Sequence, residues 1–208
     1  MLVKVCGITR VEDALAAVEA GAGAIGFIFW PKSPRFIDPH HARAIVAALP
    51  PMVTTVGVFV NQPAEYVNGV AALARLGAVQ LHGDETVDDL ATIVRPVLKS
   101  VPVKPGAEPA VDRWPARVTL LLDVHDEERR GGTGQTIDWA AAAAIAARRR
   151  SVLAGGLSPD NVADAVVRVR PYGIDVSSGV EQKPGVKDHG RIRALFEALH
   201  GIDYAARS

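Results

Sequence analysis

The sequence predicts one (β/α)8 barrel over residues 1–200, followed by a frayed tail at 201–208. Short runs rich in Val, Ile and Leu alternate with helical patterns, which indicates a parallel sheet covered on both faces. The eight predicted strand–helix units recur about every 25 residues, which is typical of a small closed barrel. Polar residues and glycines gather just after the strands, at the end where such barrels bind ligands.

The predicted strands and helices alternate along the chain. The strands cover Leu2–Cys6, Ala24–Phe29, Thr54–Val60, Ala78–His82, Val97–Val101, Val118–Asp123, Ser151–Ala154 and Ile174–Val176. The helices cover Val11–Ala20, Pro39–Ala48, Ala64–Leu76, Val87–Val94, Ala110–Trp114, Asp138–Ala147, Pro159–Arg168 and Gly190–Leu199. Proline at or near the first turn supports several helix starts, as at Asp38-Pro39. Thr9 and Glu12 form a capping-box pattern, so the first helix is expected to begin just after Thr9.

The composition excludes several classes of partner and compartment. The formal net charge is +0, so no global field favours nucleic acid or an acidic membrane surface. No apolar stretch approaches the roughly 18 residues that span a bilayer, and no signal peptide is predicted. The single cysteine excludes an internal disulfide and is consistent with a reducing cytoplasm. We expect a cytoplasmic protein with a small-molecule substrate, no nucleic-acid or membrane partner, and either a monomer or a homodimer.

Two glycine- and serine-rich loops follow the seventh and eighth predicted strands. The first contains Gly155 and Gly156, and the second contains Ser177 and Ser178. Barrels frequently bind phosphate with backbone amides at these two positions, where glycine lets the backbone approach the anion. Gly134, in a third glycine-rich loop after strand six, is placed to close over the same site. An ordinary turn would explain any one loop, but three at neighbouring positions favour a phosphate site.

Two reactive side chains are predicted at the mouth of the barrel. Cys6 ends the first strand, and a nearby cation or the phosphate site would lower the pKa of its thiol and make the thiolate a usable base. The alternative for a lone cysteine is a small buried hydrophobic residue. Asp123 follows three leucines, so partial desolvation would favour its protonated, proton-donating form, although it could also cap the next loop. A base and an acid on opposite sides of a sugar phosphate form an isomerase-type arrangement.

Three further polar residues are candidates for substrate binding. Arg35 lies in the second loop, where its guanidinium could grip a substrate carboxylate through two hydrogen bonds, or could simply be exposed. His82 is interpreted as structural or substrate-packing, because no partner ligands lie at metal spacing around it. Asp175 could orient a sugar hydroxyl or pair with a polar group of the core. Lys4 and Lys99 could point into the barrel, and neither is assigned a role.

Seven motifs, taken together and in order, resemble the phosphoribosylanthranilate isomerase family of tryptophan biosynthesis. The resemblance runs from Leu2 to about Leu199. It implies a (β/α)8 barrel without metal or cofactor, and an Amadori rearrangement of N-(5-phosphoribosyl)anthranilate to the 1-deoxyribulose product. The motifs are Lys-Val-Cys-Gly-Ile-Thr, Gly-Phe-Ile-Phe with Ser-Pro-Arg downstream, Val-Gly-Val-Phe-Val-Asn, Val-Gln-Leu-His-Gly, Gly-Gly-Thr-Gly, Leu-Ala-Gly-Gly-Leu and Asp-Val-Ser-Ser-Gly-Val-Glu.

The resemblance also implies roles for individual residues. Cys6 matches the family's base, Asp123 its acid, and Arg35 the residue that binds the anthranilate carboxylate. Asp175 matches a carboxylate close to the substrate. The residues that match the phosphate loops are Gly155, Gly156, Ser177 and Ser178. The departures are mild: Ile137 stands where the family usually has Phe, and the proline-rich region at 102–115 is not diagnostic.

Three alternatives to this function remain open at the level of sequence. The sister isomerase of histidine biosynthesis resembles this chain in fold and reaction but uses an aspartate as base on the first strand, so Cys6 argues against it. An enzyme for both substrates would need a phosphate site at each end, whereas one pair of phosphate loops is found. A non-catalytic barrel that binds a phosphorylated ligand would have no reason to place both Cys6 and Asp123 at its mouth.

Overall fold

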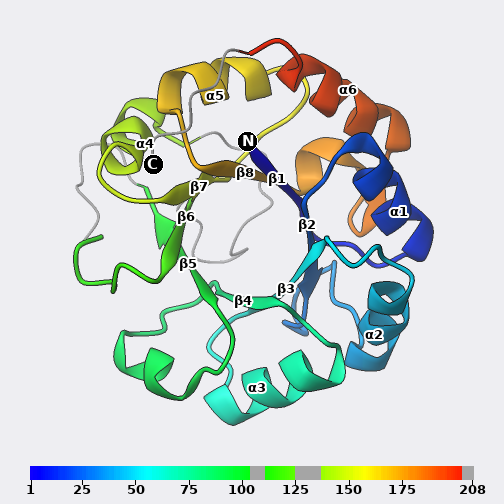
Figure 1. Ribbon diagram of the computed structural model, residues 1–208, viewed down its shortest axis with the longest axis vertical. Helices are drawn as coiled ribbons and strands as arrows, with labels where there is room; N and C mark the ends of the chain where they lie inside the picture. The colour runs from blue at the N-terminus through cyan, green and yellow to red at the C-terminus, as the bar shows by residue number, and fades with distance from the viewer. Residues whose placement is uncertain (104–110, 125–136, 203–208) are drawn as a thin grey trace.

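The computed structural model describes residues 1–103, 111–124 and 137–202 and contains a closed barrel of eight parallel strands (Figure 1). The strands pair in chain order, and β8 closes the barrel by pairing with β1. Each predicted strand is confirmed, with ends that shift by no more than one residue. The strands are β1 (Leu2–Val5), β2 (Ala24–Ile28), β3 (Thr54–Phe59), β4 (Ala78–Leu81), β5 (Val97–Pro102), β6 (Thr119–Asp123), β7 (Ser151–Leu153) and β8 (Gly173–Val176).

The helices of the described residues surround the barrel (Figure 1). They cover the apolar outer face of the strands, as the sequence pattern predicts. No helix within residues 1–103, 111–124 and 137–202 is long and apolar enough to cross a membrane. The α-helices are α1 (Val11–Ala20), α2 (Pro39–Ala47), α3 (Ala64–Leu73), α4 (Trp139–Ala146), α5 (Val162–Val169) and α6 (His189–Leu199).

Two predicted α-helices are wrong. The segment predicted at Val87–Val94 contains only the 3-10 helix η1 (Asp88–Thr92), because Pro96 and the start of β5 follow at once and leave no room for another turn. The part of Ala110–Trp114 that the structure describes forms a turn, in which the Trp114 amide donates to the Val111 carbonyl at 3.2 Å. Four prolines between 102 and 115 exclude a regular helix there.

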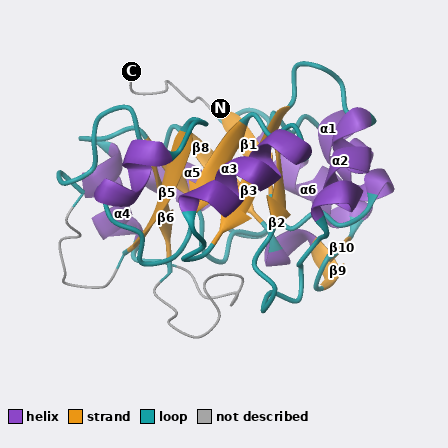
Figure 2. Cartoon of the chain, turned by 90° about the horizontal axis from the view of Figure 1, so that it is seen from below, coloured by secondary structure: helices purple, strands orange, loops and turns teal. Residues whose placement is uncertain are grey.

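The first helix starts where it is predicted, at Val11, but its predicted capping box is wrong. The helix begins at Val11, and its N-cap residue is Arg10, which makes no side-chain capping bond. The Thr9 hydroxyl instead donates to the carbonyl of Gly185, and Glu12 pairs with Arg10. Gly185 lies in a hairpin formed by β9 (Glu181–Lys183) and β10 (Val186–Lys187), at the same end of the barrel as the carboxyl ends of the strands (Figure 2). This contact with a distant segment therefore replaces the local capping box.

The interior of the barrel is polar near the carboxyl ends of its strands. Lys4, Gln80, Lys99 and Asp175 are all buried, although most of the core is aliphatic and aromatic. A buried charge is tolerated only when it is paired and hydrogen-bonded. The polar half of the barrel therefore consists of networks rather than isolated groups, and these networks form the site described below.

We predict that the cap of α2 contributes measurably to stability. Asp38 accepts hydrogen bonds from the amides of His40 and His41 at 2.8 and 3.3 Å. Asp38→Ala should lower the free energy of unfolding by about 1 kcal/mol, because it leaves these two amides without their capping acceptor. Urea unfolding would measure the change. Glu65→Ala in the first turn of α3, where no side-chain cap exists, is the control. Equal midpoints for the two variants would show that the Asp38 cap contributes nothing.

Candidate functional site

The site lies at the carboxyl ends of the strands. There, β1, β2 and β8 bring Cys6 next to the loop that follows β2 and the loop that follows β8. The Cys6 amide donates to the Val176 carbonyl at 2.8 Å, which continues the pairing of β1 with β8. Gly7 has a φ of +75°, and a Cβ atom built on it would lie 2.7 Å from Cδ of Arg35 and 3.1 Å from Oγ of Ser177. Three predicted site residues, Cys6, Arg35 and Ser177, are therefore neighbours.

The thiol of Cys6 is not activated in the way that the sequence suggests. It is 5% exposed, and burial raises its pKa above the ordinary value. Lys4 lies close enough to hydrogen-bond the sulfur and lowers the pKa, as does the more distant charge of Lys187, but neither outweighs burial and the charge of Asp175. The expectation of a lowered pKa is therefore wrong. Cys6 rests as a thiol, with cations beside it that would stabilise the thiolate once formed.

Lys4 is the centre of the polar network, although the sequence analysis assigned it no role. Its ammonium donates to Oε1 of Gln80 and to Oδ2 of Asp175, both at 2.9 Å. Burial alone would lower its pKa, but Asp175 and Cys6 together raise it above its usual value. Lys4 is therefore a permanent cation in the barrel, and it joins β1 to β4 and β8.

The sequence allows Asp175 either to pair with a polar group of the core or to orient a sugar hydroxyl. The structure shows the first, and the second carboxylate oxygen is still available for the other. Its Oδ2 atom pairs with Lys4, which is the core partner anticipated for it. Its Oδ1 atom is buried and has no hydrogen-bond partner among the described residues. Burial raises the pKa of this carboxyl despite the opposing effect of Lys4. An unpartnered buried oxygen at the mouth of the barrel is suited to accept a hydrogen bond from a ligand hydroxyl.

Asp123 ends β6 beside His82 and the loop after β7. Its Oδ1 atom accepts a hydrogen bond from the amide of Val124 at 2.8 Å, and its Oδ2 atom lies 3.4 Å from Nε2 of His82. A Cβ atom built on Gly155 would lie 3.1 Å from Oδ1. The side chain is almost fully buried, which is the desolvation that the preceding leucines predict. The described residues contain no group of three or more His, Cys, Asp or Glu side chains placed to hold a metal ion.

The two predicted phosphate loops are packed against each other. Gly155 and Gly156 have φ values of +81° and +66°, a region that favours glycine. A Cβ atom on Gly179 would lie 1.9 Å from the carbonyl oxygen of Leu157, so the loop after β8 touches the loop after β7 through backbone atoms. Asn161 fixes the first loop by donating to the Gly156 carbonyl at 2.9 Å. Gly134 lies outside the described residues.

Arg35 is held by a partner that the sequence analysis missed. Its Nε and Nη2 atoms donate to the carboxylate of Glu181 at 2.8–3.1 Å. Glu181 also accepts from Lys187 at 2.8 Å. Burial would raise the pKa of Glu181, but its bonds to these two cations lower it. One edge of the Arg35 guanidinium is therefore occupied. Among the described residues Nη1 has no hydrogen-bond acceptor, and the edge formed by Nη1 and Nη2 has the geometry to bind a carboxylate.

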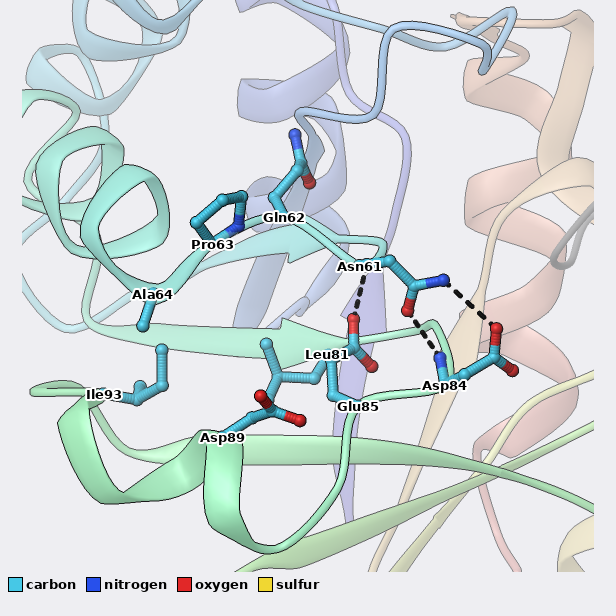
Figure 3. A pocket seen from close by; sticks show the side chains of 9 residues that line it. All are labelled: Asn61, Gln62, Pro63, Ala64, Leu81, Asp84, Glu85, Asp89 and Ile93. Carbon is cyan, nitrogen blue, oxygen red and sulfur yellow. Dashed lines mark hydrogen bonds between the residues drawn. The ribbon is translucent and has the colours of Figure 1, made fainter.

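A second polar cluster lies at the loops after β3 and β4. Glu85 accepts from the amides of Asn61 and Gly83 at 2.8 and 2.9 Å, and from Lys99 at 2.8 Å. Figure 3 shows Asn61 bonded to Glu85 and Asp84 at the edge of a cavity of about 370 Å³. Lys99, which was assigned no role, thus anchors the loop after β4. This cluster shapes the rim of the barrel.

Comparison with known proteins agrees with the resemblance. A sequence model described as N-(5'phosphoribosyl)anthranilate (PRA) isomerase matches residues 3–198. An N-(5'-phosphoribosyl)anthranilate isomerase from Pseudomonas fluorescens is 50% identical over 198 residues, which is 94% of this chain and 97% of that protein.

Solved structures give the same result. The crystal structure of phosphoribosyl anthranilate isomerase from Thermotoga maritima has a TM-score of 0.89 and 44% identity, and covers 97% of this chain and 100% of that chain. A phosphoribosyl anthranilate isomerase in complex with reduced 1-(o-carboxyphenylamino)-1-deoxyribulose 5-phosphate has a TM-score of 0.86 and 43% identity, with the same coverage. The chain therefore belongs to the N-(5'-phosphoribosyl)anthranilate isomerase family.

Proposed function

We propose that this protein catalyses the Amadori rearrangement of N-(5'-phosphoribosyl)anthranilate to 1-(2-carboxyphenylamino)-1-deoxyribulose 5-phosphate in tryptophan biosynthesis. The observation that carries the proposal is the placement of a thiol at the end of β1 and a carboxyl at the end of β6, with the two glycine- and serine-rich loops between them. A reduced form of this product is bound by the relative that is 43% identical. The Cys6 thiol distinguishes the site from that of the sister isomerase, whose base is an aspartate.

In the first step, Asp123 is the general acid. It donates its proton to the ribose ring oxygen, the bond from that oxygen to C1′ breaks, and the lone pair of the anthranilate nitrogen forms an iminium at C1′. The amide of Val124 donates to Oδ1 at 2.8 Å and would stabilise the carboxylate that remains. The buried position of Asp123 keeps water from competing for its proton.

In the second step, Cys6 is the general base. The thiol first loses its own proton to solvent, and Lys4 stabilises the thiolate that forms. This thiolate removes the proton from C2′, and the electron pair of that bond forms a double bond to C1′ as the iminium electrons return to nitrogen. The enolamine then gains a proton at C1′ and loses the hydrogen of its C2′ hydroxyl to become the ketone. Over the whole reaction, the proton that Cys6 takes balances the proton that Asp123 gives.

The remaining site residues bind and orient the substrate. The loops that contain Gly155, Gly156, Ser177 and Ser178 receive the phosphate, and Gly134, which lies outside the described residues, is a further proposed phosphate-binding residue. The free edge of Arg35 receives the anthranilate carboxylate. Oδ1 of Asp175, which is buried without a partner, accepts a hydrogen bond from a ribose hydroxyl. His82 packs against the substrate beside Asp123.

We also propose that the protein acts in the cytoplasm on this small molecule, without a nucleic-acid or membrane partner. Its single cysteine suits a reducing compartment. One relative from Thermotoga maritima is described as dimeric, and this chain is proposed to be a monomer or a homodimer. The non-catalytic alternative, a barrel that only binds a phosphorylated ligand, predicts tight binding of the product analogue without turnover.

We predict that Asp123→Asn abolishes turnover and leaves ligand binding largely intact. The amide keeps the size of the side chain but has no acidic proton, so kcat should fall by about 10²- to 10⁴-fold. Turnover is followed as the loss of fluorescence of substrate generated in situ, with a chelator present. Binding of the reduced product analogue is followed by calorimetry. Asp164→Asn, on the exposed face of α5, is the matched control. Normal turnover in Asp123→Asn would refute the assignment of the acid.

We predict that activity rises with pH because of Cys6. The ordinary pKa of a cysteine thiol is about 8.5, and burial raises the pKa of Cys6 above it. The thiolate fraction therefore keeps increasing from neutral pH to beyond about pH 8.5. The raised pKa means that the folded protein holds the thiol proton more tightly than the unfolded chain does. The stability gained from this difference is present below the ordinary pKa and is lost as the pH rises above it. The profile of kcat against pH at saturating substrate would measure the rise. Cys6→Ala should have almost no activity at any pH, and full activity in this variant would show that the base lies elsewhere.

We predict that Glu181→Gln weakens substrate binding by releasing Arg35. The amide loses the charge that holds the guanidinium, so KM should rise about tenfold, which corresponds to about 1.4 kcal/mol, with a smaller effect on kcat. Steady-state kinetics would separate the two constants. Lys183→Gln, an exposed change on the same hairpin, is the control. An unchanged KM for Glu181→Gln would contradict the role given to the Arg35–Glu181 pair.

A further inference from the structure

Three buried side chains and the partly buried His82 form a continuous line across the polar half of the barrel. Asp175 on β8 accepts from Lys4 on β1, and Lys4 also donates to Gln80 on β4, both at 2.9 Å. The other polar atom of the Gln80 amide lies 2.7 Å from Nδ1 of His82, at the end of β4. Gln80 is 1% exposed, so no water competes for these bonds.

The donors along this line have only one consistent arrangement. An ammonium group can only donate, so the atom of Gln80 that faces Lys4 must be the carbonyl oxygen Oε1. The atom that faces His82 is then the amide nitrogen Nε2, which can only donate. Nδ1 of His82 must therefore accept, and the hydrogen of the neutral ring lies on Nε2. The cation at Lys4 thus dictates the tautomer of a histidine that it does not touch.

The nitrogen that carries this hydrogen faces the proposed acid. Oδ2 of Asp123 and Oγ of Ser100 each lie 3.4 Å from Nε2 of His82. Such contacts often tighten only when substrate is bound. With the hydrogen on Nε2, His82 offers a donor to the carboxylate that forms when Asp123 gives up its proton. With the hydrogen on Nδ1, it would instead present a lone pair that competes for the proton of the acid.

We propose that Gln80 is a positioning residue for the proposed reaction, which holds the hydrogen of His82 on the nitrogen that faces Asp123. The proposal rests on the assignment of Asp123 as the acid. A hydrogen-bond donor that points at a site of developing negative charge lowers the activation barrier, here for the proton transfer from Asp123. The alternative is that Gln80 only satisfies Lys4 in the core, in which case the tautomer would have no effect on the reaction.

The tautomer can be measured directly by nitrogen-15 NMR of the histidine rings in the intact protein. Protonated and unprotonated ring nitrogens give separate signals, and the His82→Asn variant assigns those of His82. We expect hydrogen on Nε2 in the unaltered protein. In Gln80→Glu, the carboxylate still accepts from Lys4 but can no longer donate, so we expect Nδ1 of His82 to carry a hydrogen. In Gln80→Met, we expect the preference for Nε2 to weaken toward that of an unconstrained histidine ring.

The kinetic effect should follow the tautomer. We expect kcat of Gln80→Glu and Gln80→Met to fall about 10- to 100-fold, because the ring hydrogen of His82 acts on the carboxylate of Asp123. KM should change little, because neither variant removes the His82 ring that packs against the substrate. Gln182→Glu, at an exposed position in β9, is the control for an added charge. Thermal unfolding identifies any variant that has lost its fold. Gln80→Glu is included because it keeps an acceptor for Lys4 and is therefore expected to fold.

Each outcome decides the proposal. Hydrogen on Nδ1 in the unaltered protein would overturn it, as would a tautomer that is the same in all folded variants. A changed tautomer with unchanged kcat would also overturn it and leave Gln80 with a structural role. A changed tautomer with reduced kcat supports it. If the unaltered protein does not turn over phosphoribosylanthranilate, the proposed function fails, and the NMR result still reports separately on the hydrogen that Gln80 holds.

Discussion

The buried ammonium of Lys4 is the interaction on which the polar half of this barrel depends. A cation at 2% exposure would be strongly unfavourable without partners, and Lys4 has acceptors from β4 and β8 and the thiol of Cys6 close by. Because the group can only donate, it orients every acceptor around it. The position of one carboxylate, one amide and, through the amide, one imidazole all follow from this charge.

The proposed base and acid have different electrostatic surroundings. Cys6 lies beside Lys4 and within the field of Lys187, so the thiolate has cations near it although burial raises the pKa of the thiol. Among the described residues, Asp123 contacts the amide of Val124 and the ring of His82. The two proposed proton-transfer groups therefore have different neighbours, cations beside Cys6 and the amide of Val124 and the His82 ring beside Asp123.

The sequence was sufficient to predict the strands but not the networks. Apolar runs and their flanking glycines locate all eight strands, and the barrel then places Cys6, Asp123 and Asp175 at one end. The partner of Lys4 on β8 lies 171 residues away, and that of Arg35 lies 146 residues away, so no local pattern connects them. The capping box at Thr9 failed for the same reason, because the hairpin with Gly185 supplies a competing acceptor.

Cys6 lies between two networks that share no hydrogen bond among the described residues. One runs from Asp175 through Lys4 toward His82, and the other joins Arg35, Glu181 and Lys187 beside the hairpin. Lys187 also donates to the carbonyl of Ser177, which places the second network at the loop after β8 that we propose to bind phosphate. A ligand that binds both Arg35 and that loop therefore spans the second network and presents its central carbons to Cys6 and to the first. This arrangement lets the proposed binding groups and the proposed proton-transfer groups be supported by separate side chains in so small a barrel.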